Sequence, residues 1–240
     1  MTAPEDKTRR AALVAIVTSA AAIATGLSLG LPLLALVLQA RGVSGTWIGL
    51  NTAVAGLASI FAPALVTPLA RLVGAGRLLT GMLALVAVTF FTFHLVDGLA
   101  GWFVLRLVFH GALTIAFVVS EFWLMTLAPP EKRGLLVGVY ATVFSIGLAV
   151  GPLVLAMTGS TGPLPFLVGA CILAAAILPV HLARRVPPDL HEASRHGTLG
   201  FVVAAPVATF AAFAFGAVES GGLAILPLWG LAQGLDEGRA

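Results

Sequence analysis

The sequence predicts an all-α, polytopic membrane protein, and three observations support this prediction. Of the 240 residues, 59% are hydrophobic and only 10% are charged, whereas soluble domains contain about 25% charged residues. Seven apolar stretches are each long enough to cross a bilayer, which takes about 20 residues of α-helix. Nearly all basic residues lie on alternate connections between these stretches. A transmembrane barrel is excluded, because its strands are about ten residues long and alternate in polarity.

The first predicted span, residues 11–38, contains no charged residue. It is too long for the apolar core of a signal peptide, and the acidic Glu5 and Asp6 before it also suit a signal peptide poorly, so we expect it to be retained. The other predicted spans are residues 47–70, 77–97, 101–128, 135–157, 163–183 and 199–233. The last is long enough to tilt or to extend past the bilayer. Since a backbone in lipid must satisfy its own hydrogen bonds, each span is predicted to be a helix.

The placement of basic residues predicts the orientation of the chain. Ten of the 13 basic residues lie on one side of the spans: Lys7, Arg9, Arg10, Arg71, Arg77, Lys132, Arg133, Arg184, Arg185 and Arg195. Arg41 and Arg239 lie on the other side, and Arg106 falls inside a span. By the positive-inside rule, we expect a multi-pass protein of the cytoplasmic (inner) membrane of a bacterium, with a cytoplasmic N-terminus. Three tryptophans then gather near the outer interface, as in an aromatic belt: Trp47, Trp102 and Trp229.

Composition and motifs argue against several other classes of protein. The sequence pI is about 9.8, but the basic residues are dispersed at helix ends, where they set topology and meet anionic lipid, so we expect no nucleic-acid partner. No histidine pair has a metal-ligand spacing with a supporting cysteine or carboxylate, and Cys171 is the only cysteine, so we expect no metal site and no intramolecular disulfide. No Walker loop, dinucleotide-binding motif or nucleophile–base pair is visible, so we expect no cofactor and no enzyme.

The longest polar interruption divides the chain into two parts. We predict a six-helix bundle over residues 1–183, a cytoplasmic linker over 184–198, and the first helix of a second bundle within 199–240. An internal repeat with an offset of 195 residues crosses this linker, since Leu31-Pro32-Leu33 matches Leu226-Pro227-Leu228. Both matched spans run from the cytoplasm outward, as a parallel repeat requires.

The connections that follow the two matched spans are also alike. Gly42-Val43-Ser44 follows the first span, where Ser44 is predicted to cap the next helix, and Gly234-Leu235-Asp236 follows the seventh. Asp236 is an equally good cap for an eighth helix. We therefore expect a chain that continues past Ala240, to about 390 residues if the duplication is completed.

The chain resembles members of the major facilitator superfamily, whose fold consists of two six-helix bundles. The resemblance covers essentially the whole chain and rests on four segments: Gly42-Val43-Ser44 with Ile48-Gly49-Leu50, Arg106 near the start of the fourth span, Lys132-Arg133-Gly134 with Gly138, and Gly147-Leu148-Ala149-Val150-Gly151-Pro152. It implies an incomplete twelve-helix fold and a transporter.

Two of the family's conformational motifs are altered. The connection Arg71-Leu72-Val73-Gly74-Ala75-Gly76-Arg77 keeps the glycine Gly74 and two arginines, but it lacks the usual acidic residue. The fifth-span motif keeps Gly147, Gly151 and Pro152, but Val154 and Leu155 follow in place of later glycines. The first change puts a gating salt bridge in doubt, and the second gives no basis for an export function. We expect these residues to act in packing and conformational change.

Ionisable residues inside predicted spans are the candidates for a transport pathway, because such groups usually face a cavity or a partner. In the fourth span, Arg106, His110, Thr114 and Glu121 share one arc of about 80° on a helical wheel, with Arg106 and Glu121 about 22 Å apart along the axis. We expect a polar stripe along a substrate or proton pathway. The alternative for Glu121 is a fixed latch within the bundle. Glu219 lies near the middle of the seventh span, between small residues.

These observations predict a secondary active transporter that moves a small solute across the cytoplasmic membrane by alternating access, with proton coupling. Its expected partners are the lipid bilayer, an unknown small-molecule substrate and protons. The alternative is a truncated, non-transporting half-transporter or a membrane interaction module. Self-association would be needed if the chain is truly this short, because six helices and one more cannot close an alternating-access cavity.

Overall fold

The computed structural model describes residues 3–183 and 206–234, and within these ranges every regular element is helical. The helices are α1 (Ala3–Ala40), α2 (Gly45–Val73), α3 (Ala75–Leu95), α4 (Leu99–Leu127), the short 3-10 helix η1 (Pro130–Lys132), α5 (Arg133–Thr158), α6 (Leu164–Ala175), α7 (Ile177–Ala183) and α9 (Pro206–Ala232). The predicted all-α membrane fold is confirmed.

Six helical stretches of the described residues are long and apolar enough to cross a membrane. They correspond to the first six predicted spans, although α1 begins well before residue 11 and the sixth span is divided into α6 and α7. The seventh predicted span, 199–233, begins outside the described residues and continues into α9. The predicted linker, residues 184–198, and Asp236 also lie outside the described residues.

The division of the sixth span was not predicted, and Pro179 explains it. A proline has no backbone N–H, so Pro179 cannot donate the helical hydrogen bond to the carbonyl of Ala175. The helix α6 ends at Ala175 and α7 begins at Ile177. A proline near the end of an apolar span therefore interrupts the helix without a polar residue to mark the break.

The connection between the second and third spans lies within the predicted segment Arg71–Arg77 but is much shorter than that segment. In the structure α2 and α3 meet at the single residue Gly74, whose φ is 83°. Glycine adopts positive φ without the steric cost that a side chain would impose, so one residue suffices to reverse the chain. Ser44 occupies the N-cap position of α2 as predicted, but its side chain makes no capping hydrogen bond.

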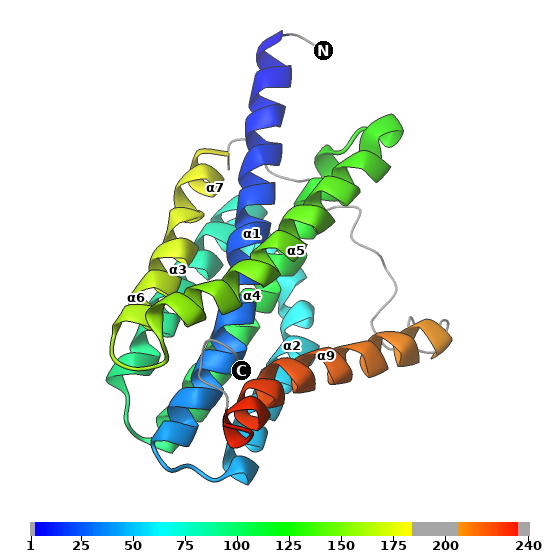
Figure 1. The fold of residues 1–240 in the computed structure, drawn as a ribbon. Coiled ribbons are helices and arrows are strands. Elements are labelled where there is room, and N and C mark those ends of the chain that lie inside the picture. The colour runs from blue at the N-terminus through cyan, green and yellow to red at the C-terminus, as the bar shows by residue number, and fades with distance from the viewer. Residues whose placement is uncertain (1–2, 184–205, 235–240) are drawn as a thin grey trace.

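Helix α1 forms the centre of the bundle and packs against α4, α5, α6 and α7, as Figure 1 shows. Its N-terminal extension reaches α4, where Nε of Arg9 donates a hydrogen bond to the carbonyl oxygen of Leu127 at 2.9 Å. A cation is favourable at a helix C-terminus because unpaired carbonyls gather there. This contact holds the start of α1 against the end of α4.

The core beside α1 contains a cluster of aromatic rings from α3, α4 and α6. Phe90 lies 5.4 Å from Phe109 and 5.9 Å from Phe166 between ring centroids, and Phe93 lies 5.0 Å from Trp102. Trp102 was predicted to stand in an interfacial belt, but its side chain is fully buried in this cluster. Trp47 and Trp229 are instead more than half exposed.

Candidate functional site

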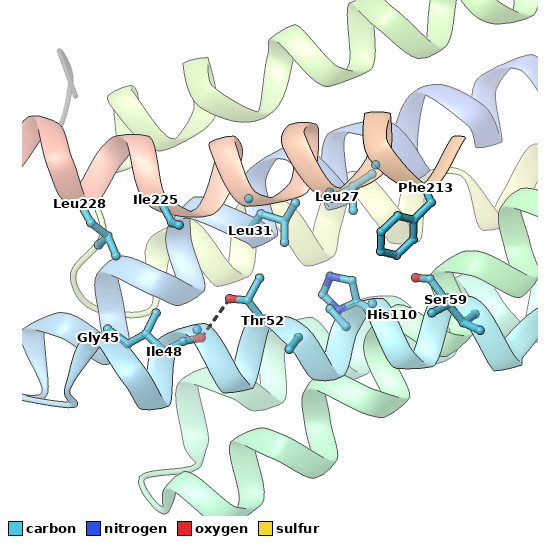
Figure 2. Close-up of a pocket in the computed structure, with 18 residues that line it drawn as sticks. Leu27, Leu31, Gly45, Ile48, Thr52, Ser59, His110, Phe213, Ile225 and Leu228 are labelled. Atoms are coloured by element: carbon cyan, nitrogen blue, oxygen red, sulfur yellow. Dashed lines mark hydrogen bonds between the residues drawn. The ribbon is translucent and has the colours of Figure 1, made fainter. Parts of the chain in front are cut away.

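A cavity of about 610 Å³ lies between α2 and α9, beside α1 and α4. Figure 2 shows α9 on one side of the cavity and α2 on the other, with Phe213 and His110 facing each other at one end. Its lining residues are Leu27, Leu31, Gly45, Ile48, Gly49, Thr52, Ala53, Ala55, Gly56, Ser59, Ile60, His110, Phe213, Gly216, Ala217, Gly221, Ile225 and Leu228. The volume lies within the range of small-molecule sites, about 300–1,000 Å³.

In the part of the chain that the structure describes, the cavity wall is apolar apart from three side chains. Thr52 donates its hydroxyl hydrogen to the carbonyl of Ile48 at 3.1 Å, so this hydroxyl is occupied within its own helix. Ser59 accepts a hydrogen bond from the hydroxyl of Thr114 at 3.0 Å. His110 is the one titratable residue among the lining residues. A ligand in this cavity would therefore meet one basic ring and two hydroxyl groups on an otherwise apolar surface.

Arg106 lies one helical turn before His110 on α4 and is fully buried. Its Nε donates a hydrogen bond to Oδ1 of Asn51 on α2 at 2.9 Å. Nη1 and Nη2 of Arg106 are buried without a hydrogen-bond partner among the described residues, as is Nδ2 of Asn51. Arg106 does not itself line the cavity. A buried guanidinium normally pairs with a carboxylate, so this arrangement leaves a positive charge that no described acidic group neutralises.

Helices α2 and α4 hold these polar groups in a regular register. Asn51 with Arg106 and Ser59 with Thr114 are both separated by 55 residues in the sequence. A constant offset over two turns means that the two helices run parallel and do not slip relative to each other. The two hydrogen bonds therefore fix how α4 is rotated toward α2.

The imidazole ring of His110 is 3% exposed and points into the cavity in Figure 2. Its Nδ1 lies 3.3 Å from the carbonyl oxygen of Arg106, four residues earlier in the same helix. Its Nε2 is buried and has no hydrogen-bond partner in the described part of the chain. A buried nitrogen without a partner is unfavourable in a folded protein, because it loses its hydrogen bond to water.

The four residues of the predicted polar stripe therefore do not all face the same part of the structure. Arg106, His110 and Thr114 lie on the side of α4 that meets α2, and only His110 lines the cavity. Glu121 lies further along α4, is exposed and does not line the cavity. Glu121 forms no ion pair or side-chain hydrogen bond with another described residue, which the alternative role as a latch would require. Glu219 lies within α9, but its side chain is outside the described part of the structure.

The predicted conformational residues fall into two groups. Arg71 and Arg77 are exposed on either side of Gly74 at the junction of α2 and α3. Gly147 and Gly151 are buried where α5 crosses α1, and Pro152 follows them inside α5. These two groups of residues are not part of the cavity.

The glycines of α5 allow a close approach of two helices. A Cβ added to Gly147 would lie 2.5 Å from the carbonyl oxygen of Ala21, and one added to Gly151 would collide with Oγ of Ser28. Hydroxyl groups of α1 also bond to α5, since Thr25 donates to the carbonyl of Gly147 at 3.1 Å. Small residues permit such backbone contact between membrane helices, where it replaces the hydrophobic driving force.

Sequence reasoning missed Asn51, which holds Arg106. A signal for it existed, because Asn51 is the single asparagine of the chain and stands within a predicted span. It also missed the aromatic wall that Phe213 of α9 provides. For metal binding, the described residues contain no group of three histidine, cysteine, aspartate or glutamate side chains that could hold an ion.

Comparison with known proteins places this arrangement in a family. Residues 14–239 match the sequence model of the Major Facilitator Superfamily. Over 169 residues, the chain is 26% identical to a protein named as the uncharacterized MFS-type transporter YfkF of Bacillus subtilis (strain 168). The matched segment covers 70% of this chain and 42% of that protein, so it corresponds to less than half of the relative. Because the family match extends over nearly all of this multi-pass helical chain, the chain belongs to the Major Facilitator Superfamily.

Proposed function

We propose that the protein is a secondary active transporter that moves a small solute across the cytoplasmic membrane by alternating access, coupled to protons. Membership of a transporter family supports a transport role in general and agrees with the expectation that the protein is not an enzyme. In this proposal residues 1–183 form the first bundle, 184–198 the cytoplasmic linker, and 199–240 the start of a second bundle.

The observation that supports the proposal most directly is the cavity between α2 and α9. In transporters built from repeats, substrate sites lie near the bilayer midplane where the repeats meet. In this chain the cavity is bounded by α1, α2 and α4 on one side and by α9 on the other. Among its described lining residues, it combines an apolar wall with one titratable side chain, that of His110.

The movement that alternating access requires would involve helices with interior prolines. Pro32, Pro152 and Pro227 lie inside α1, α5 and α9. A proline inside a helix frees a carbonyl and favours a bend at that level. We infer that these three helices bend when the cavity changes the side on which it opens.

The test is transport by the complete natural protein that contains this chain, purified and reconstituted into liposomes. Uptake of labelled organic solutes is measured with a pH gradient of either direction and without one. We expect at least one solute to accumulate against its concentration gradient only when the pH gradient is present. A folded protein that moves no solute in any gradient would contradict the proposal.

The alternative of a non-transporting membrane module is tested in parallel by the oligomeric state of the same preparation in detergent. We expect a monomer that transports. A self-associated protein without transport in the same liposomes would favour the interaction module instead.

A further inference from the structure

The hydrogen bond within α4 fixes which nitrogen of His110 carries a hydrogen. The carbonyl oxygen of Arg106 can only accept, so Nδ1 of His110 must donate in this contact. A neutral imidazole carries one hydrogen, so Nε2 of the neutral ring has a lone pair and accepts. This acceptor belongs to a side chain that is 3% exposed, lines the cavity and has no described partner at Nε2.

The charge around the cavity favours an anionic ligand. None of the 18 described lining residues is acidic, and among them His110 is the one that can become charged. Behind it on α4 lies the buried guanidinium of Arg106, with two nitrogen atoms unpartnered among the described residues. From the neighbouring helices, α2 presents Asn51, Thr52 and Ser59, which are neutral, and the described lining side chains of α1 and α9 are apolar. In a medium of low dielectric constant, an uncompensated cation attracts an anion strongly.

We propose that the substrate is a small amphiphilic monoanion of the carboxylate type, which binds with its anionic group at Nε2 of His110 and its apolar body along the cavity. This inference rests on the proposed transport function and names the substrate class for the same site. The apolar body would lie between Leu27 and Leu31 of α1, Ile48 of α2, and Ile225 and Leu228 of α9. Phe213 faces His110 at the end where the anionic group would bind (Figure 2).

Binding of the anion brings one proton into the site. Because Nδ1 already donates to Arg106, Nε2 can donate to a carboxylate only after His110 takes up a proton. That proton comes from the bulk solution, where the acid form of the buffer or hydronium gives it up and becomes the conjugate base or water. The lone pair of Nε2 forms the new N–H bond, so the ring gains one positive charge as the ligand adds one negative charge. The net charge of the site is unchanged. Anion and proton are therefore predicted to enter and leave together.

The first experiment measures the charge preference of the complete protein in lipid nanodiscs. Binding is titrated with carboxylate, primary amide and ammonium derivatives of the same three apolar skeletons: naphthalene, biphenyl and octane. We expect at least one carboxylate to bind at least tenfold more tightly than its amide and its ammonium derivatives. Equal or tighter binding of the amides or the ammonium compounds, or no binding of any carboxylate, would overturn the proposal.

The second experiment measures proton uptake by titration calorimetry in buffers of different ionisation enthalpy. The unmodified protein should take up close to one proton for each carboxylate bound. The substitution His110→Gln keeps a side chain of similar reach but cannot take up a proton, so it should weaken carboxylate binding at least tenfold and abolish the uptake. Thr142→Val is the control, since Thr142 is exposed on α5 and bonds only to Gly138 of its own helix. Unchanged proton uptake in His110→Gln would contradict the role of this ring.

The liposome assay separates failure of the substrate class from failure of the transport function. A protein that accumulates cations or neutral solutes, and whose His110→Gln variant does so equally well, would be a transporter with a different substrate. A protein that binds carboxylates with one proton but never moves them would retain the site without the transport function.

Discussion

Nε of Arg106 donates a hydrogen bond to Oδ1 of Asn51 at 2.9 Å, and this contact joins α4 to α2 in the interior of the bundle. Both side chains are fully buried. The remaining nitrogen atoms of the pair have no partner in the described ranges, so a single hydrogen bond holds a charge that costs about 2.5–3.5 kcal/mol to place inside a membrane. We therefore expect substitutions in this pair to change both the free energy of unfolding and ligand binding.

Replacing Asn51 tests this relationship. Asn51→Leu removes the described acceptor of the guanidinium, and a hydrogen bond to a charged group contributes about 1.5–3 kcal/mol, so we expect a lower free energy of unfolding by about that amount. Asn51→Asp supplies a carboxylate that neutralises Arg106, so it should preserve the thermal unfolding temperature and reduce binding of anionic ligands in the cavity. Unfolding temperatures in detergent and carboxylate titrations measure both effects. An Asn51→Asp protein with undiminished anion binding would show that the charge of Arg106 does not act on the cavity.

Alanine substitutions of glycines in α5 test how tightly α1 and α5 pack where they cross. Gly151→Ala places a methyl group against Ser28 and Leu29 of α1, and overpacking typically costs about 1–3 kcal/mol. Gly138→Ala is the matched control in the same helix, because no atom lies within 4 Å of the added methyl group. We expect Gly151→Ala to lower the unfolding temperature and Gly138→Ala to leave it unchanged or raise it, since alanine has the higher helix propensity. Equal effects of the two substitutions would contradict the close approach.

Substitution of Glu121 tests whether this carboxylate contributes to folding stability or to proton-coupled transport. It is exposed and has no described ion pair, so Glu121→Gln should change the free energy of unfolding by less than about 0.5 kcal/mol. If Glu121 belongs to the proton pathway, proton-driven uptake in liposomes should fall at least tenfold while carboxylate binding in the cavity stays intact. Normal uptake by a normally abundant Glu121→Gln protein would remove Glu121 from the pathway. The exposed Thr126→Val, on the same helix, is the control.

The connection between α3 and α4 is held by two donors that share one acceptor. Arg41 and Trp102 both donate to the carbonyl oxygen of Val96, at 2.8 and 2.7 Å, and the guanidinium of Arg41 lies 4.9 Å from the centroid of the Trp102 ring. Arg41→Ala removes one hydrogen bond and the cation–π contact, so we expect a loss of about 1–2 kcal/mol in the free energy of unfolding. Asp97→Asn should have almost no effect, because Asp97 is 98% exposed and lies 3.7 Å from Arg41. Unfolding temperatures of the two variants decide whether the ion pair or the contacts to Val96 and Trp102 stabilise this end.

Prediction of the helices from the sequence succeeded because hydropathy is a local property. A segment that enters lipid must form its hydrogen bonds within itself, so long apolar stretches predict helices without knowledge of their neighbours. The errors arose at single residues. Gly74 reverses the chain alone, and Pro179 interrupts a helix inside an apolar span, and neither event changes the hydropathy of its surroundings.

Prediction of the site succeeded only in part. The helical period placed Arg106, His110 and Thr114 on one arc of α4, and the structure brings this arc against α2. The same arc included Glu121, which does not line the cavity. The partner of Arg106 is Asn51, 55 positions earlier in the sequence, and no periodicity within one helix can identify a contact at that separation.

The sequence by itself determined that the chain is a multi-pass helical membrane protein, with residues 14–239 matching one transporter family. Only the tertiary structure decided that His110 lines the cavity with Nε2 free of described partners, that Asn51 holds Arg106, and that Trp102 is buried. The physical reason is that these helices are apolar around most of their circumference, so hydrophobicity does not define how each is rotated. Rotation is set by close contacts of small residues and by hydrogen bonds between helices, which form only when the bundle packs.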